Sequence, residues 1–138
     1  MIRAVVCVSA NAEADLNLLW AGSQKDADDG DLCAIVLEEL ETDPKLQAML
    51  LSDGAGKFEA NGTTVKQWKE HYNKGKDLWS LKFWDAEATL CSQRIIYAYF
   101  IQTKQFHVLA IVHRKFDYAY DHPITQRILR DYEALLGS

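Results

Sequence analysis

Residues 93–113 read QRIIYAYFIQTKQFHVLAIVH, and this stretch decides the fold. Aromatic and β-branched residues fill residues 93–101 and 105–113, which is typical of two β-strands. The few polar residues between them have the length of a hairpin loop. Residues 78–84 have a similar composition and precede the hairpin closely. Because strands joined by short loops cannot run parallel, the three segments predict an antiparallel β-meander.

The chain before the meander is expected to be mainly helical, after one short strand. Residues 2–8 are rich in Val and predict that strand. Ser9 and Asn11 can cap a helix over residues 10–20, where apolar residues recur at helical spacing. A polar connection then leads to a second helix that is expected to begin near Asp31.

Two further helices are indicated by proline at the first helical position. The pair Asp43 and Pro44 predicts an N-cap and a short helix over residues 45–51. Pro123 opens a terminal helix with apolar residues at helical spacing, and Asp121 is its expected cap. These elements place helices on either side of the meander in the sequence.

We therefore expect a single α+β domain over residues 1–138. In this fold, an N-terminal strand and a helical hairpin pack on an antiparallel β-meander, and a C-terminal helix completes the domain. The helices are expected to stack on one face of the sheet. A composition of 49% hydrophobic residues can supply the core, and no run approaches the roughly 18 apolar residues of a membrane span. Residues 57–76 have no clear pattern.

The charge of the chain is divided between its two halves. The net charge is −5, and residues 1–56 carry 11 acidic and 3 basic residues, or about −8. Residues 57–138 carry 9 acidic and 12 basic residues, or about +3. This division excludes a uniformly basic nucleic-acid binder, but it allows a protein with one acidic and one basic face.

Standard catalytic and cofactor signatures are absent from the sequence. It has no P-loop, no dinucleotide-binding glycine motif and no paired cysteines at metal-binding spacing. The four histidines are not spaced as a metal-binding pair, so neither a metal nor another cofactor is expected. Three widely spaced cysteines form no disulfide framework and are typical of a protein in the reducing cytoplasm.

Basic residues are concentrated on the expected strands. Lys82 and Arg94 lie inside the first and second strands of the meander, Lys76 precedes the first, and Arg114 and Lys115 follow the third. Because the end of the third strand lies near the start of the second, we expect these cations to gather on one surface. Such a surface suits the phosphodiester backbone of a nucleic acid.

Aromatic residues are interleaved with these bases, as in sites that stack single-stranded RNA. Trp79 and Tyr97 can equally belong to the core, whereas Tyr118 and Tyr120 fall in an expected loop. His113 adjoins the terminal basic residues, whose charges favour a neutral imidazole that can accept a proton. The alternative is an ordinary surface histidine at the end of a strand.

Four short motifs of the second half resemble the RelE/ParE superfamily of small bacterial toxins, especially its HigB-like, phage-derived branch. The motifs are Leu78-Trp79-Ser80-Leu81-Lys82, Gln93-Arg94-Ile95-Ile96-Tyr97, Leu109-Ala110-Ile111-Val112-His113-Arg114-Lys115 and His122-Pro123. The resemblance covers about residues 60–135. It departs from the family at Lys82, where an arginine is usual, and at Ser80, where a glutamate is usual.

The resemblance implies the toxin of a toxin–antitoxin pair, a ribosome-dependent mRNA endoribonuclease. In this chemistry the 2′-hydroxyl of the RNA attacks the adjacent phosphate without a metal. The residues assigned to catalysis are Arg94, His113 and Tyr120, and those assigned to RNA binding are Lys76, Lys82, Arg114 and Lys115. The implied partners are the ribosome with its mRNA and a cognate antitoxin whose chain covers the basic surface.

Two other hypotheses remain open from the sequence. The first is a non-catalytic binding module of the same fold, either a toxin that binds DNA gyrase or an inactive homologue. The second is a small oligomeric interaction domain, such as a homodimer, whose exposed aromatic residues form the self-interface.

Overall fold

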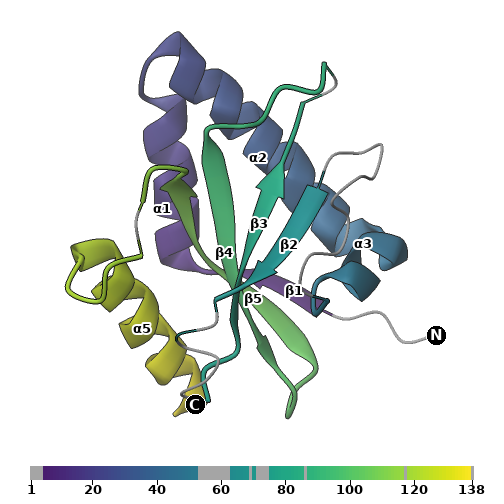
Figure 1. The fold of residues 1–138 in the computed structure, drawn as a ribbon, viewed down its shortest axis with the longest axis vertical. Helices are drawn as coiled ribbons and strands as arrows, with labels where there is room; N and C mark the ends of the chain where they lie inside the picture. The colour runs from purple at the N-terminus through teal and green to yellow at the C-terminus, as the bar shows by residue number, and fades with distance from the viewer. Residues whose placement is uncertain are drawn as a thin grey trace.

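Five strands form one mixed β-sheet in the computed structural model, which describes residues 5–52, 63–68, 70, 75–85, 87–116 and 118–137 (Figure 1). The strands are β1 (Val5–Val8), β2 (Thr63–Gln67), β3 (Leu78–Phe83), β4 (Gln93–Phe100) and β5 (Gln105–His113). Their order in the sheet is β1-β5-β4-β3-β2. The α+β class and the three-stranded antiparallel meander, β3 to β5, are confirmed.

The sheet differs from the expected meander at both edges. β1 pairs with β5 in parallel, from Val5 opposite Gln105 to Val8 opposite Val108. The long chain between β1 and β5 makes this parallel pairing feasible. At the other edge, β2 pairs with β3 in antiparallel fashion and uses part of the stretch without a clear pattern, residues 57–76. Residues 57–62, 69 and 71–74 of that stretch lie outside the described residues.

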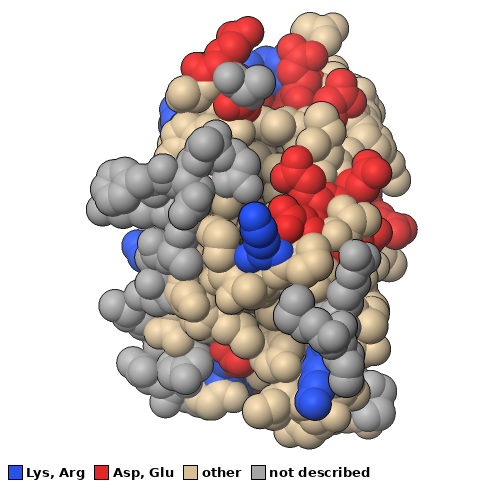
Figure 2. All heavy atoms as spheres, turned by 90° about the vertical axis from the view of Figure 1, so that its right-hand side faces the viewer, with Lys and Arg blue, Asp and Glu red and all other residues tan. Residues whose placement is uncertain are grey.

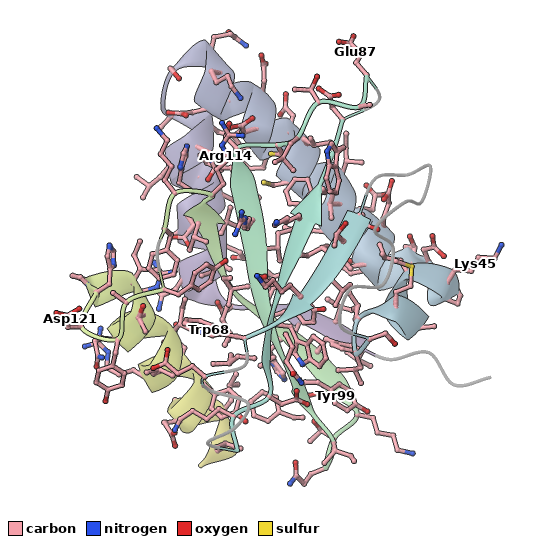
Figure 3. The ribbon with its side chains drawn as sticks, viewed as in Figure 1. Lys45, Trp68, Glu87, Tyr99, Arg114 and Asp121 are labelled. Atoms are coloured by element: carbon pink, nitrogen blue, oxygen red, sulfur yellow. The ribbon has the colours of Figure 1, made fainter. Side chains whose placement is uncertain are left out.

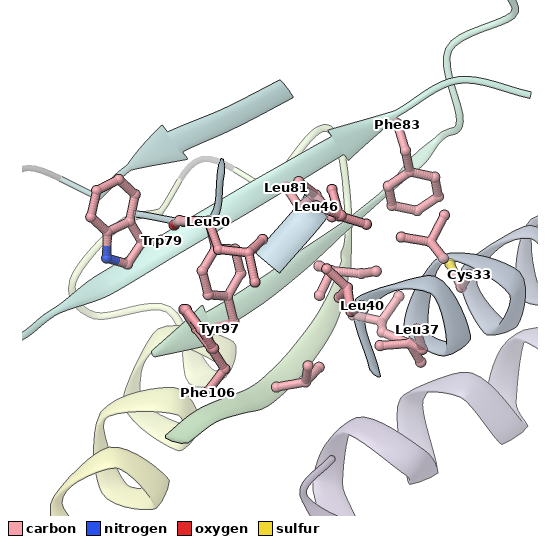
Figure 4. Close-up of a cluster of buried hydrophobic side chains, with 14 of the residues drawn as sticks. Cys33, Leu37, Leu40, Leu46, Leu50, Trp79, Leu81, Phe83, Tyr97 and Phe106 are labelled. Atoms are coloured by element: carbon pink, nitrogen blue, oxygen red, sulfur yellow. Dashed lines mark hydrogen bonds between the residues drawn. The ribbon is translucent and has the colours of Figure 1, made fainter. Parts of the chain in front are cut away.

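Helices cover both faces of the sheet, which corrects the expectation of a single covered face. The helices α1 (Ala10–Trp20), α2 (Gln24–Thr42) and α3 (Pro44–Met49) pack with one core cluster, shown in Figure 4. The helix α5 (Pro123–Leu136) contributes Ile128 and Tyr132 to a second cluster on the opposite face. The physical reason is that β3, β4 and β5 bury consecutive residues, and such strands need cover on both sides.

Side-chain caps fix the helix starts. Ser9 accepts a hydrogen bond from the backbone N–H of Ala12, and Asp43 caps α3, so these two predicted caps are confirmed, whereas Asn11 lies inside α1 and does not cap it. α2 begins at Gln24, earlier than expected, because Ser23 caps it and its polar first turns remain helical. The cap of α5 is His122, whose Nδ1 accepts from an N–H 3.0 Å away, and not Asp121.

No helix within the described part of the chain is both long and apolar enough to cross a membrane.

A strained residue closes the hairpin between β4 and β5. Lys104 has a φ of 55°, in the left-handed region that is costly for residues with a Cβ atom. We expect Lys104→Gly to raise the free energy of unfolding by about 0.5–1 kcal/mol, because glycine adopts this conformation without that cost. Urea unfolding measures the change. Lys104→Ala is the matched control, since it removes the same charge and keeps the Cβ atom. Equal stability of the two variants would contradict the prediction.

Candidate functional site

A pocket of about 370 Å³ opens on the face of the sheet that α5 partly covers. We call it the Arg94 pocket. Its lining residues come from β2, β3, β4 and the segments that follow β2 and β5, and they are Lys66, Gln67, Trp68, Glu70, Ser80, Arg94 and Tyr118. Figure 3 shows Trp68 between the strands and α5. The pocket therefore lies where the cover provided by α5 ends.

The register of the strands places three cations on this face. Lys66 pairs with Ser80, and Leu81 pairs with Ile95, so Lys82 and Arg94 are cross-strand neighbours. Because paired residues of antiparallel strands point to the same face, their side chains lie together. The predicted proximity of Lys82 and Arg94 follows directly from this register, and Lys66 joins them from the edge strand.

The three cations repel one another. Burial lowers the pKa of Lys82, and the positive charges of Arg94 and Lys66 lower it further. The ion pairs among the described residues are Lys25–Asp29, Lys76–Glu133 and Arg127–Asp15, so none of them involves this cluster. An anion in the pocket would offset the repulsion and restore the pKa of Lys82 toward its ordinary value.

Aromatic rings form the wall of the pocket beside Arg94. The rings of Trp68 and Tyr118 meet edge to face with centroids 4.9 Å apart, and Phe116 lies 4.8 Å from Tyr118. Arg94 Nη1 is 3.5 Å from the Tyr118 hydroxyl oxygen, which makes a long hydrogen bond. Tyr118 has a φ of 62°, a strained conformation for an aromatic residue. Such strain is concentrated at functional sites.

The structure does not bring His113 into the Arg94 pocket. His113 pairs with Gln93, whose side chain contacts the buried Asp29 of α2 on the other face of the sheet. The cause is a β-bulge, because the register between β4 and β5 shifts next to Ile96 and skips Leu109. Without this extra residue, His113 would point to the same face as Arg94.

Tyr120 is also outside the pocket. Its side chain is 60% exposed, in the segment before α5, whereas Tyr118 lines the pocket and contacts Arg94. Of the three residues assigned to catalysis, only Arg94 therefore lies in the pocket.

The remaining basic residues of the expected cluster lie elsewhere. Arg114 (Figure 3) is close to Lys25 of α2. The hydrogen bond to Asp29 is the main cause of the raised pKa of Lys25, and the positive charge of Arg114 acts in the opposite direction. Lys76 forms a 2.8 Å ion pair with Glu133 near the end of α5. Lys115 is exposed in the turn after β5, and it does not line the pocket.

The sequence did not indicate that Lys66, Trp68, Glu70 and Ser80 line a pocket. The alternation of Lys66 and Trp68 is a signal for a strand with both side chains on one face. Glu70 brings a carboxylate to a pocket that is otherwise cationic, and it is not without partners in the structure.

Neither a family model nor a curated protein matches this chain. Among the residues that the structure describes, no three His, Cys, Asp or Glu side chains are placed to hold a metal ion.

Proposed function

We propose that this protein binds single-stranded RNA in the Arg94 pocket and acts as the toxin of a toxin–antitoxin pair, cleaving mRNA on the ribosome. The observation that carries the proposal is the gathering of Arg94, Lys82 and Lys66 on one sheet face, outside every ion pair of the described residues. The adjacent Tyr118, which is half-buried and packs against the buried Trp68, supplies aromatic surface for a nucleobase. The resemblance to RelE/ParE toxins supports the same proposal.

The distribution of charge favours one orientation of a polyanion. Acidic side chains gather on the side of the molecule formed by α2 and α3, as Figure 2 shows. Exposed members of this acidic side include Asp31, Glu38 and Glu41. RNA is repelled from this side and attracted to the Arg94 pocket, so a protein with a net charge of −5 can still bind a nucleic acid.

The proposed chemistry needs no metal. The 2′-hydroxyl of the RNA gives up its proton as its oxygen attacks the adjacent phosphorus, the bond from phosphorus to the 5′-oxygen breaks to leave a 2′,3′-cyclic phosphate, and the leaving 5′-oxygen takes up a proton. Arg94 would hold the non-bridging phosphate oxygens and Lys82 would stabilise the developing negative charge. The Tyr118 hydroxyl, 3.5 Å from Arg94 Nη1, is the proposed proton-transfer group in place of His113 and Tyr120.

A second candidate is a non-catalytic binding module, such as a toxin that binds DNA gyrase. It is favoured by the position of His113 on the opposite face from Arg94, and no histidine is found among the residues that line the pocket. In either case the proposed protein partner is an antitoxin whose acidic segment covers the Arg94 pocket.

Reconstituted cleavage tests the proposal against this alternative. We expect the purified protein to cleave mRNA on ribosomes in the presence of a chelator, leaving a 5′-hydroxyl end. A 2′-deoxynucleotide at the cleaved position should abolish the reaction, because it lacks the attacking oxygen. Cleavage of the deoxy substrate would contradict the mechanism.

Expression in growing cells provides the second measurement. An RNA-cleaving toxin should stop methionine incorporation first, whereas a gyrase-binding toxin should stop thymidine incorporation first. Undisturbed growth with no RNA binding would overturn both proposals and leave the oligomeric domain. Light scattering would then show a homodimer or a larger assembly.

A further inference from the structure

Two buried cysteines from distant parts of the chain lie together beneath α2. Cys33 belongs to α2 and Cys91 to the segment just before β4, and both are part of the same core cluster. Their exposed fractions are 0% and 4%. The backbone N–H of Cys91 donates to Phe83 O at 2.9 Å, and Cys33 lies on the Phe83 side of the cluster (Figure 4). Both thiols are free in this structure.

The environments of the two thiols are asymmetric. Gln93, two residues after Cys91, donates to Asp29, which lies one turn before Cys33 in α2, so the two cysteines face each other between α2 and the sheet. The interaction between the two thiols raises the pKa of Cys33 and lowers that of Cys91. The backbone N–H of Gln93 and the ammonium group of Lys25 also favour the Cys91 thiolate, while burial and Asp29 oppose it. Cys91 is therefore the better nucleophile, and Cys33 is placed beside it with its proton retained.

We propose that Cys33 and Cys91 are a redox-active pair that forms an intramolecular disulfide on reaction with hydrogen peroxide. The Cys91 thiolate attacks one peroxide oxygen, the O–O bond breaks, and the departing oxygen leaves as water after protonation. The resulting Cys91 sulfenic acid is attacked by the Cys33 sulfur, which forms the S–S bond and releases a second water. Two electrons pass from the thiols to hydrogen peroxide, and a dithiol reductant reverses the reaction.

The disulfide would join α2 covalently to the start of β4, the strand that carries Arg94. The proposal does not depend on RNA binding, because it uses only the contact between the two thiols. Cys7 in β1 separates this proposal from oxidation by exposure alone. Cys7 is more accessible than either buried thiol, and it is not part of the core cluster that contains Cys33 and Cys91.

The test is hydrogen peroxide treatment, alkylation of remaining thiols and mass spectrometry of the whole chain. We expect the wild-type protein and Cys7→Ser to lose two hydrogen atoms and to yield a peptide that links Cys33 to Cys91. Cys91→Ser and Cys33→Ser should not form this link. The oxidised wild-type protein should melt roughly 5–10 °C higher than the reduced form, because the bond constrains a long loop of the unfolded chain.

Three outcomes would overturn the proposal. They are alkylation of both buried thiols after Cys7 has been oxidised, addition of oxygen to Cys91 without a disulfide, and a disulfide that contains Cys7. The mapping in Cys7→Ser keeps both buried cysteines, so its result does not depend on how well the serine variants fold.

Discussion

Arg94→Ala is expected to abolish RNA cleavage and to weaken RNA binding by about 1–3 kcal/mol, or roughly 5- to 150-fold. The guanidinium is the only arginine group among the residues that line the pocket. Loss of such a donor to a developing negative charge typically costs about 100- to 1,000-fold in rate. Filter binding with a short single-stranded RNA measures affinity, and the ribosome assay measures cleavage. The salt dependence of binding should also become shallower.

The same substitution should leave the fold intact. The polar contact recorded for the Arg94 side chain is the long hydrogen bond to Tyr118, and the neighbouring Lys82 is destabilised by the Arg94 charge. Removing that charge should therefore raise the pKa of Lys82 and leave the free energy of unfolding unchanged within about 0.5 kcal/mol. Arg130→Ala on α5 is the charge-matched control. If Arg94→Ala binds RNA as tightly as this control, the assignment of the pocket is wrong.

Arg114→Ala distinguishes the cluster of basic residues expected from the sequence from the cluster found in the structure. The sequence places Arg114 with Arg94, whereas the structure places it near Lys25. The reason is that β5 ends at His113, so Arg114 lies in the turn that follows and strand alternation does not set its direction. The extra residue at Leu109 explains instead why His113 is not on the face of Arg94, because a one-residue change of register moves the later side chains of a strand to the other face. Hydrophobic patterning cannot reveal this bulge, because β5 is apolar on both faces.

Residue patterning located β1, β3 to β5 and the helices, but it did not reveal β2, the start of α2 or the placement of helices on both faces of the sheet. The strands β3 to β5 and the caps Ser9 and Asp43 follow from residue types and spacing. The placement of helices on both faces follows from the same apolar runs, since a strand that buries consecutive residues needs two covered sides. The early start of α2 could not be predicted, because residues 24–28 are mostly polar and their helix depends on the Ser23 cap and on the preference for acidic residues near a helix N-terminus.

Asp15→Ala is expected to lower the free energy of unfolding by about 2–4 kcal/mol, the largest effect on stability that we predict for a polar residue. Asp15 of α1 accepts two hydrogen bonds from Arg127 of α5, at 2.7 and 2.9 Å. It also accepts one from the backbone N–H of Ile111 at 3.0 Å. β1 ends at Val8, opposite Val108, so Asp15 replaces the missing strand partner at this edge. Urea unfolding with an unchanged slope measures the loss.

The size of the effect comes from what the substitution leaves behind. Asp15→Ala leaves the Arg127 guanidinium and the backbone N–H of Ile111 without the carboxylate that they bind. The side chains of Asp15 and Arg127 are only 14% and 24% exposed. Arg127→Met removes the pair but leaves Asp15 bound to Ile111, so it should cost less, about 1–2 kcal/mol after allowance for partial solvent screening. The double variant should then be little worse than Asp15→Ala, giving a coupling energy above about 1 kcal/mol. Additive effects of the two substitutions would contradict this coupling between α1 and α5. By comparison, Asp121→Ala removes an exposed carboxylate and should change the free energy of unfolding by less than about 0.5 kcal/mol.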